Sequence, residues 1–62
     1  MTEQQSKIVK TFADCNMNAQ ATANFMCYHR NTIIYHLQKV KKETGLDPMN
    51  FYDLVKLLNL GA

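Results

Sequence analysis

The sequence predicts a small all-α fold of four helices, and three observations lead to this prediction. Apolar residues recur at helical spacing in four segments, and a capping residue can be assigned before each. The chain has 2 Gly and 1 Pro, too few for the tight turns of a strand-rich domain. Its apolar content of 47% with 19% charged residues is ordinary for a folded domain. We therefore expect one domain spanning residues 1–62, of modest stability because of its size.

The first predicted helix begins at Thr2 or Glu3, because Thr2 and Gln5 have the spacing of a capping box. It should stop near Asn16, where two asparagines flank a methionine and weaken the helix. The residues expected to face the core are Ile8, Val9, Phe12 and Ala13.

A second, short helix is predicted from the cap Asn18 to Met26 or Cys27. Its alternating alanines let another helix approach closely, as a tight helical corner requires. Ala23 and Met26 are expected to face inward, with Phe25 or Ala19 at the flank.

The third predicted helix runs from about Arg30 to Glu43 or Thr44, with His29 as its cap. Its apolar stripe comprises Ile33, Leu37, Val40 and Thr44. Gly45 occupies the place of a left-handed C-cap residue. The preceding turn holds Cys27 where a glycine is often found, which is tolerable if Cys27 keeps a negative φ.

After a connection over residues 46–49, Asn50 and Asp53 have the spacing of a cap for a fourth helix, which ends at about Asn59. The stripe predicted to be buried comprises Phe51, Leu54, Val55 and Leu58.

Charge is concentrated in the third segment. The whole chain carries only +2, but no acidic residue occurs between Tyr28 and Lys42. The positive charges in this segment are Arg30, Lys39, Lys41 and Lys42. Its first turn is the polar run 29–32, His-Arg-Asn-Thr, whose side chains hydrogen-bond well to base edges and phosphates. An amphipathic, positively charged helix with a polar leading end fits a DNA major groove.

The segment HRNTIIYHLQKVKKETGLD resembles the signature of the C-terminal helix-turn-helix domain of PucR/CdaR-type bacterial transcription regulators. The matching positions are His29, Arg30, Asn31, Thr32, Ile33, Tyr35, Leu37, Lys39, Thr44, Gly45 and Asp47, with Asn18, Thr22 and Ala23 upstream. The resemblance spans roughly residues 7–60, and a more distant likeness is to Fis-type nucleoid proteins. It implies a four-helix helix-turn-helix DNA-binding domain, with the motif at about 18–44 and a recognition helix at about 30–44. The chain departs from the family at Ile34 and His36, where Arg is common, so its phosphate contacts or preferred sequence should differ.

Docking of the second motif helix in the major groove assigns base contacts to His29, Arg30 and Asn31. The alternative is that His29 only caps the helix and Asn31 is only solvated. Thr32 and Tyr35 are expected at phosphates, unless the Tyr35 ring packs against the first helix.

Further contacts are predicted beside this first turn. Ile34 could contact a thymine methyl group, a dimer partner or a loop. Lys39 shares a side with Tyr35 and is the preferred phosphate contact among the lysines. Asn18 and Gln20, at the start of the preceding helix, could also bind a phosphate.

Catalysis is not predicted, because no Gly-rich phosphate loop or nucleophile–base pair is evident, and Cys27 and His29 point in different directions. The four possible zinc ligands, Cys15, Cys27, His29 and His36, do not have the spacing of a structural zinc site. We therefore expect no metal and no cofactor. Without an apolar leader or a long apolar run, we expect reduced thiols and a cytoplasmic, nucleoid-associated protein without a membrane anchor.

The predicted partner is double-stranded DNA, bound by a homodimer or by a chain tethered to an upstream sensor or dimerisation region. The sequence does not decide between an excised domain and a stand-alone protein. The rival interpretation is a helical protein-interaction or dimerisation module without DNA binding. Salt separates the two, because DNA affinity falls steeply with salt and an apolar interface responds little.

Overall fold

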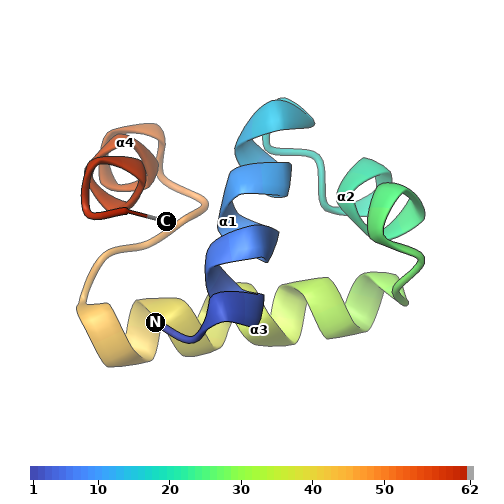
Figure 1. The fold of residues 1–62 in the computed structure, drawn as a ribbon, viewed down its shortest axis with the longest axis horizontal. Coiled ribbons are helices and arrows are strands. Elements are labelled where there is room, and N and C mark those ends of the chain that lie inside the picture. Colours follow the sequence, from blue (N-terminus) through green and yellow to red (C-terminus); the bar gives the residue numbers. More distant parts are fainter. Residues whose placement is uncertain (62) are drawn as a thin grey trace.

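The computed structural model describes residues 1–61, which form four helices and no strand. The helices are α1 (Glu3–Asp14), α2 (Ala19–Met26), α3 (Arg30–Thr44) and α4 (Phe51–Asn59). Figure 1 shows α1 standing across α3, with α2 on one side of α1 and α4 on the other. α1 packs against all three other helices, while α4 contacts only α1 among the helices. The predicted all-α fold is confirmed.

The helix starts follow from their capping residues. The Thr2 hydroxyl accepts a hydrogen bond from the Gln5 amide at 3.1 Å, and the Gln5 side chain accepts one from the Thr2 amide at 2.9 Å. This reciprocal pair satisfies two amides that the first turn leaves free. The Gln5 side chain, which is buried, also donates to Glu43 at 3.1 Å and so ties the start of α1 to the end of α3.

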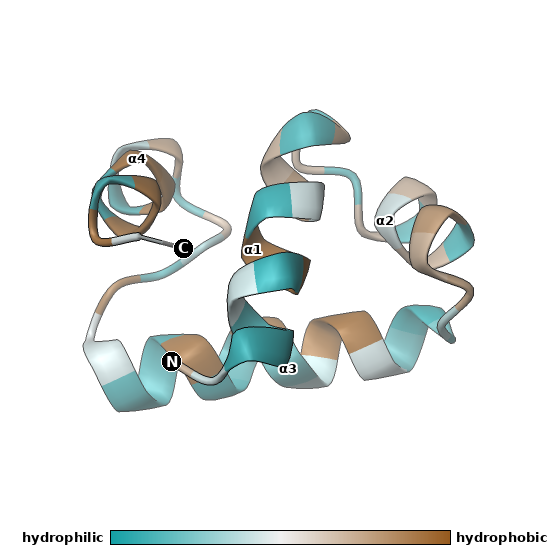
Figure 2. Ribbon diagram, viewed as in Figure 1, coloured by the Kyte–Doolittle hydropathy of each residue, from teal (hydrophilic) through white to brown (hydrophobic). Residues whose placement is uncertain are grey.

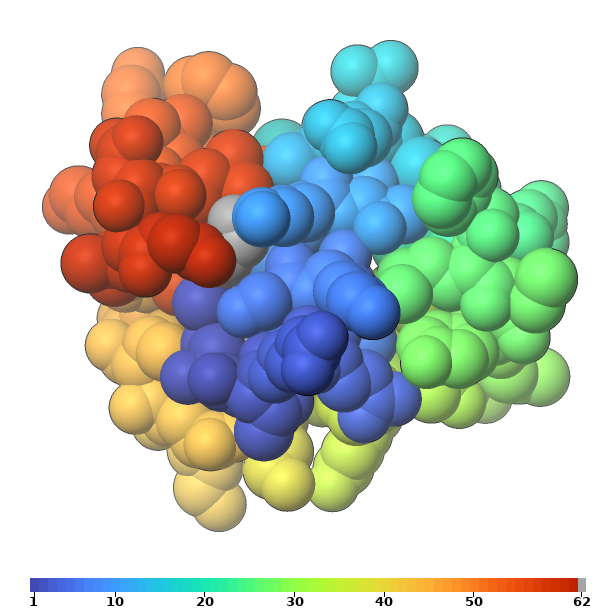
Figure 3. All heavy atoms as spheres, viewed as in Figure 1, coloured from blue at the N-terminus to red at the C-terminus, as the bar shows by residue number. Residues whose placement is uncertain are grey.

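The core lies where α1 crosses its three neighbours. The fully or almost fully buried apolar residues are Ile8, Val9 and Phe12 of α1, Ala23 of α2, Ile33, Leu37 and Val40 of α3, and Leu54 and Leu57 of α4. Burying a Val, Leu, Ile or Phe side chain contributes about 1.5–3 kcal/mol. In Figure 3, the atoms of α1 lie between those of α4 and those of α2. α1 is therefore the element on which the two sides of the molecule are assembled.

α1 ends at Asp14 with Cys15 as its C-cap, and so stops near Asn16 as predicted; Asn16 and Met17 both adopt positive φ and turn the chain toward α2. Two other details differ from the sequence-based expectations. Thr44 was expected in the buried stripe of α3 but is exposed at the last position of the helix, where its hydroxyl donates to the Val40 carbonyl at 2.7 Å. Cys27 does not keep a negative φ: it lies in the left-handed region at φ 59°.

The buried side of α4 also differs from the predicted stripe. Leu57, which the prediction left out, is completely buried, whereas Phe51 is 61% exposed and Val55 39% exposed. Leu54 is buried as predicted, and Leu58 is half-buried. α4 has apolar residues on most of its circumference, so spacing alone did not identify the side that faces α1.

The predicted caps of the later helices are present. Asn18 caps α2, His29 caps α3 and Asn50 caps α4. Gly45 is the left-handed C-cap of α3 at φ 75°. Within residues 1–61, no helix combines the length and the apolar character needed to cross a membrane.

Candidate nucleic-acid interface

α2 and α3 form a helical corner joined by a short turn at residues 27–29. The Tyr28 amide donates to the Ala23 carbonyl at 2.9 Å, and the Cys27 amide also bonds back into the last turn of α2. The left-handed Cys27 redirects the chain so that α3 can begin within three residues. Buried Ala23 and Thr22 allow α2 to lie close to α3. This arrangement is a helix-turn-helix.

The first turn of α3 is free of the protein core. His29, Arg30 and Asn31 are all exposed, and Thr32 is half-buried. The ion pairs among the described residues are Lys7–Glu3 and Lys41–Asp47, so Arg30 has no carboxylate partner there. Figure 2 shows this end of α3 as hydrophilic, in contrast to the apolar residues in the middle of the helix.

His29 caps α3 through its ring. The His29 Nδ1 atom accepts a hydrogen bond from the Asn31 amide at 3.2 Å. In the neutral ring the proton is therefore on Nε2, and that N–H remains available as a donor. Capping and an outward contact are compatible in this geometry, so the cap does not decide between the two roles that the sequence left open.

The side of α3 that points away from α1 carries hydroxyl, amide and ammonium groups. Tyr35, Gln38, Lys39 and Lys42 line one shallow hollow of about 280 Å³. The Tyr35 ring is 57% exposed, so its packing against the first helix is excluded as the main environment. The Lys39 ammonium nitrogen lies 5.9 Å from the centre of the Tyr35 ring, within the range of a cation–π contact.

The structure separates the lysines of α3. Lys41 Nζ lies 3.7 Å from Asp47 Oδ2, whereas Lys39 and Lys42 are exposed in the hollow with Tyr35. Sequence reasoning selected Lys39 but not Lys42 or Gln38. Gln38, Lys39 and Lys42 follow Tyr35 by three, four and seven residues, and this helical spacing indicates that all four side chains share one face. Ile34 is half-buried.

The start of α2 offers a second polar region. Asn18 Oδ1 accepts from the Ala21 amide at 2.9 Å and caps the helix, while the residue itself is exposed. Gln20 is exposed and donates to the Asn24 side chain at 3.1 Å. Two helix N-termini, those of α2 and α3, are thus closed by polar side chains, and helix N-termini attract anions such as phosphate.

Metal-binding geometry is lacking in the part of the chain that the structure describes, where no three His, Cys, Asp or Glu side chains lie close enough to hold an ion. Cys15 is half-buried and Cys27 exposed, and both are free thiols.

The corner and its exposed polar turn define a helix-turn-helix domain of the DNA-binding class. The family model of the PucR C-terminal helix-turn-helix domain matches residues 6–59, and the chain belongs to this family. Membership implies a DNA-binding role in transcription regulation, as the sequence resemblance predicted. Comparisons with curated proteins and with solved structures found no match.

Proposed function

We propose that this chain binds double-stranded DNA in a sequence-specific manner, with α3 in the major groove. The observation that carries the proposal is the exposed, carboxylate-free Arg30 next to exposed Asn31 at the leading end of α3. Arg pairs in bidentate fashion with guanine, and Asn with adenine, on the major-groove edge. We assign the motif to residues 18–44 within one domain, and the recognition helix to 30–44.

The remaining contacts follow from the same docking. The His29 Nε2–H group is free to donate to a base or a phosphate, and Thr32 and Tyr35 supply hydroxyls. Lys39, joined by Lys42, follows the phosphate backbone along the outward side of α3. Asn18 and Gln20 approach a phosphate from α2. Ile34 contributes only the part of its side chain that remains exposed.

One copy reads a short site. A single recognition helix contacts only a few base pairs, and a net charge of +2 gives little non-specific attraction. Useful affinity therefore requires two copies on neighbouring half-sites or a tether to another DNA-bound region. We place the protein with nucleoid DNA in the bacterial cytoplasm.

The test is selection of preferred sites from random duplex DNA at near-physiological salt, followed by titration of variants on the selected site. Arg30→Ala should lower affinity by about 5- to 150-fold, corresponding to the loss of about 1–3 kcal/mol for one bidentate base contact. It should also relax the preference at one base position. Lys39→Ala should instead weaken binding to all sequences alike and reduce the salt dependence.

Lys10→Ala is the matched control, because it also removes one exposed positive charge but lies on α1, outside the helix-turn-helix. It should change affinity by less than about twofold. If no sequence is enriched, or if Arg30→Ala and Lys10→Ala behave alike, the proposed reading of DNA by Arg30 is wrong. Partner binding that barely responds to salt, without DNA binding, would favour the interaction-module alternative.

A further inference from the structure

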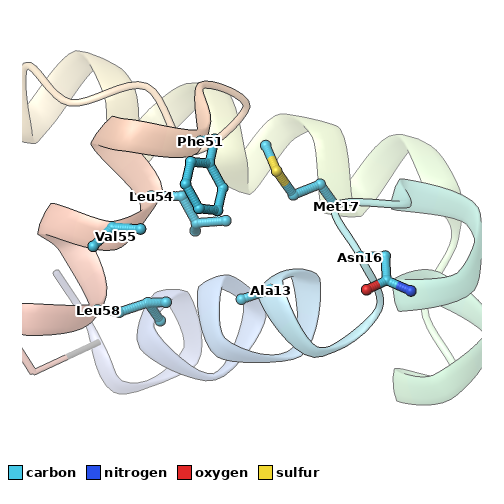
Figure 4. Close-up of a pocket in the computed structure, with 7 residues that line it drawn as sticks. All are labelled: Ala13, Asn16, Met17, Phe51, Leu54, Val55 and Leu58. Atoms are coloured by element: carbon cyan, nitrogen blue, oxygen red, sulfur yellow. The ribbon is translucent and has the colours of Figure 1, made fainter.

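An apolar hollow of about 310 Å³ lies between the end of α1 and α4. α4 lines it with Phe51, Leu54, Val55 and Leu58, and α1 and the turn after it contribute Ala13 and Met17. Figure 4 shows the Phe51 ring and the Met17 side chain facing each other across this hollow. The lining includes no charged residue, and Asn16 at one edge is its polar member.

Large apolar side chains stand beside this hollow in solvent. Phe51 is 61% exposed, Tyr52 76% exposed and Val55 39% exposed. The Phe51 and Tyr52 rings are in edge-to-face contact with centres 5.7 Å apart, so the two form one aromatic knob. Because an aromatic side chain buries about 150–250 Å², these three residues leave roughly 300–400 Å² of apolar surface uncovered. We call this surface, with the hollow, the α4 face.

We propose that the α4 face binds a second copy of this chain, an inference that rests on the DNA-binding function proposed above. The same face carries both a projecting ring, Tyr52, and an apolar hollow beside it. A twofold-symmetric interface requires a self-complementary surface of this kind. In the pair, the Tyr52 ring of each copy enters the hollow of the other. The uncharged lining gives a phosphate or a charged peptide no ion-pair partner.

The uncovered area sets the strength of this contact. A stable interface buries about 800 Å² per partner, roughly twice what the α4 face offers. The contact alone is therefore weak, and the chain should be monomeric at micromolar concentration without DNA. Binding of two copies to adjacent half-sites raises their effective concentration, and the contact then appears as cooperativity.

The position of the α4 face suits this role. α4 lies at one end of the long axis and the first turn of α3 at the other, so pairing through α4 leaves the recognition turns uncovered (Figure 1). One copy measures 25 Å along that axis, so the recognition turns at the outer ends of a pair lie farther apart than this. Two copies in line would place these turns up to about twice that distance apart. Half-sites in successive major grooves are about 34–36 Å apart, so the two copies must meet with their long axes inclined to occupy both.

The experiment compares duplexes carrying one selected half-site with duplexes carrying an inverted repeat at one helical turn, using gel mobility shift. The parent chain should bind the second half-site at least about tenfold more tightly than the first. Tyr52→Ser and Val55→Asp should abolish this cooperativity and leave single half-site affinity within about twofold. Both residues are exposed, and thermal unfolding checks that the variants remain folded.

Phe25→Ser is the matched control, because Phe25 is as exposed as Tyr52, at 76%, but lies on α2. It should retain the cooperativity. Independent filling of two half-sites by the parent chain, or cooperativity that survives both α4 substitutions, would overturn the proposed pairing. If the parent chain does not bind a duplex with a single half-site at all, the DNA-binding proposal itself is wrong.

Discussion

The two ends of the molecule expose opposite kinds of surface. The first turn of α3 presents His29, Arg30 and Asn31 to solvent with no carboxylate nearby among the described residues. α4 presents Phe51, Tyr52 and Val55. Figure 2 shows the difference as a hydrophilic start of α3 and a largely hydrophobic α4. Both ends are supported by α1, which packs on α2, α3 and α4.

This contrast matches the two proposed tasks, which a chain of 62 residues can place at separate ends without a deep cleft. Charged and amide groups can remain solvated until they meet DNA, at little cost to folding. Singly exposed rings such as Phe25 are common, but neighbouring exposed apolar side chains such as Phe51, Tyr52 and Val55 form a patch of the kind that marks association surfaces. The polar end therefore fits the proposed recognition of nucleic acid, and the apolar end fits the proposed pairing of two copies.

The largest effect on folding stability is expected from truncating a side chain on the buried side of α4. Leu57→Ala should destabilise the fold by about 2–5 kcal/mol, because Leu57 is fully buried where α4 packs on α1. Phe51→Ala removes a larger side chain but should cost less than about 1 kcal/mol, since Phe51 is mostly exposed. Urea denaturation of both variants measures the difference. If Phe51→Ala proved the more damaging change, the assignment of the inner and outer sides of α4 would be reversed.

Substitutions of Asn18 should have an intermediate effect, and two of them separate its contribution to stability from its contribution to DNA binding. Asn18→Ala removes the acceptor of the Ala21 amide and should cost about 1 kcal/mol in stability. Asn18→Asp keeps a capping oxygen and should preserve stability, but its negative charge should weaken DNA affinity by repelling the phosphate. Thermal unfolding and DNA titration of the two variants provide the measurement. Unchanged DNA affinity in Asn18→Asp would remove Asn18 from the proposed interface.

The sequence predicted the starts of the helices better than the buried side of α4. The helix starts at Thr2, Asn18, His29 and Asn50 are local features, and capping side chains identify them from a few neighbouring residues. The exposure of Arg30 follows from the amphipathic pattern of a long helix. Which of these polar residues contact DNA stays a prediction.

The buried side of α4 was harder to predict, because it is determined by packing against α1, which is distant in the sequence. In FYDLVKLLN, Asp53, Lys56 and Asn59 share one side of the helix and apolar residues occupy the wide remaining arc. Within that arc, residues 51, 54, 55 and 58 fit a helical stripe as well as 54 and 57 do. The face of α1 selects among them, and that choice is made in three dimensions. The hollow beside Phe51 has the same origin, because it forms only where α4 meets the end of α1.

The smallest effect on stability is expected at the C-terminal ends of α2 and α3. Both ends adopt the same left-handed backbone conformation, but with different residues. α3 ends in Gly45 at φ 75°, whereas α2 ends in Cys27 at φ 59°. A residue with a Cβ atom costs about 1–2 kcal/mol in this region, and glycine does not. Cys27→Gly should therefore stabilise the fold by about 0.5–1 kcal/mol, the relief of strain being partly offset by the greater freedom of glycine in the unfolded chain.

Gly45→Ala provides the reciprocal test. A Cβ atom at Gly45 would meet no atom within 4 Å, so the expected loss of about 1 kcal/mol reflects backbone conformation alone. Cys27→Ala, which keeps the Cβ atom, should leave stability nearly unchanged and serves as the control. For a domain of this size, 1 kcal/mol corresponds to a shift in Tm of about 4–8 °C, measurable by circular dichroism. A destabilised Cys27→Gly variant would mean that the Cys27 side chain contributes more to the corner than its exposure indicates, and that the turn before α3 is held by contacts and not only by backbone geometry.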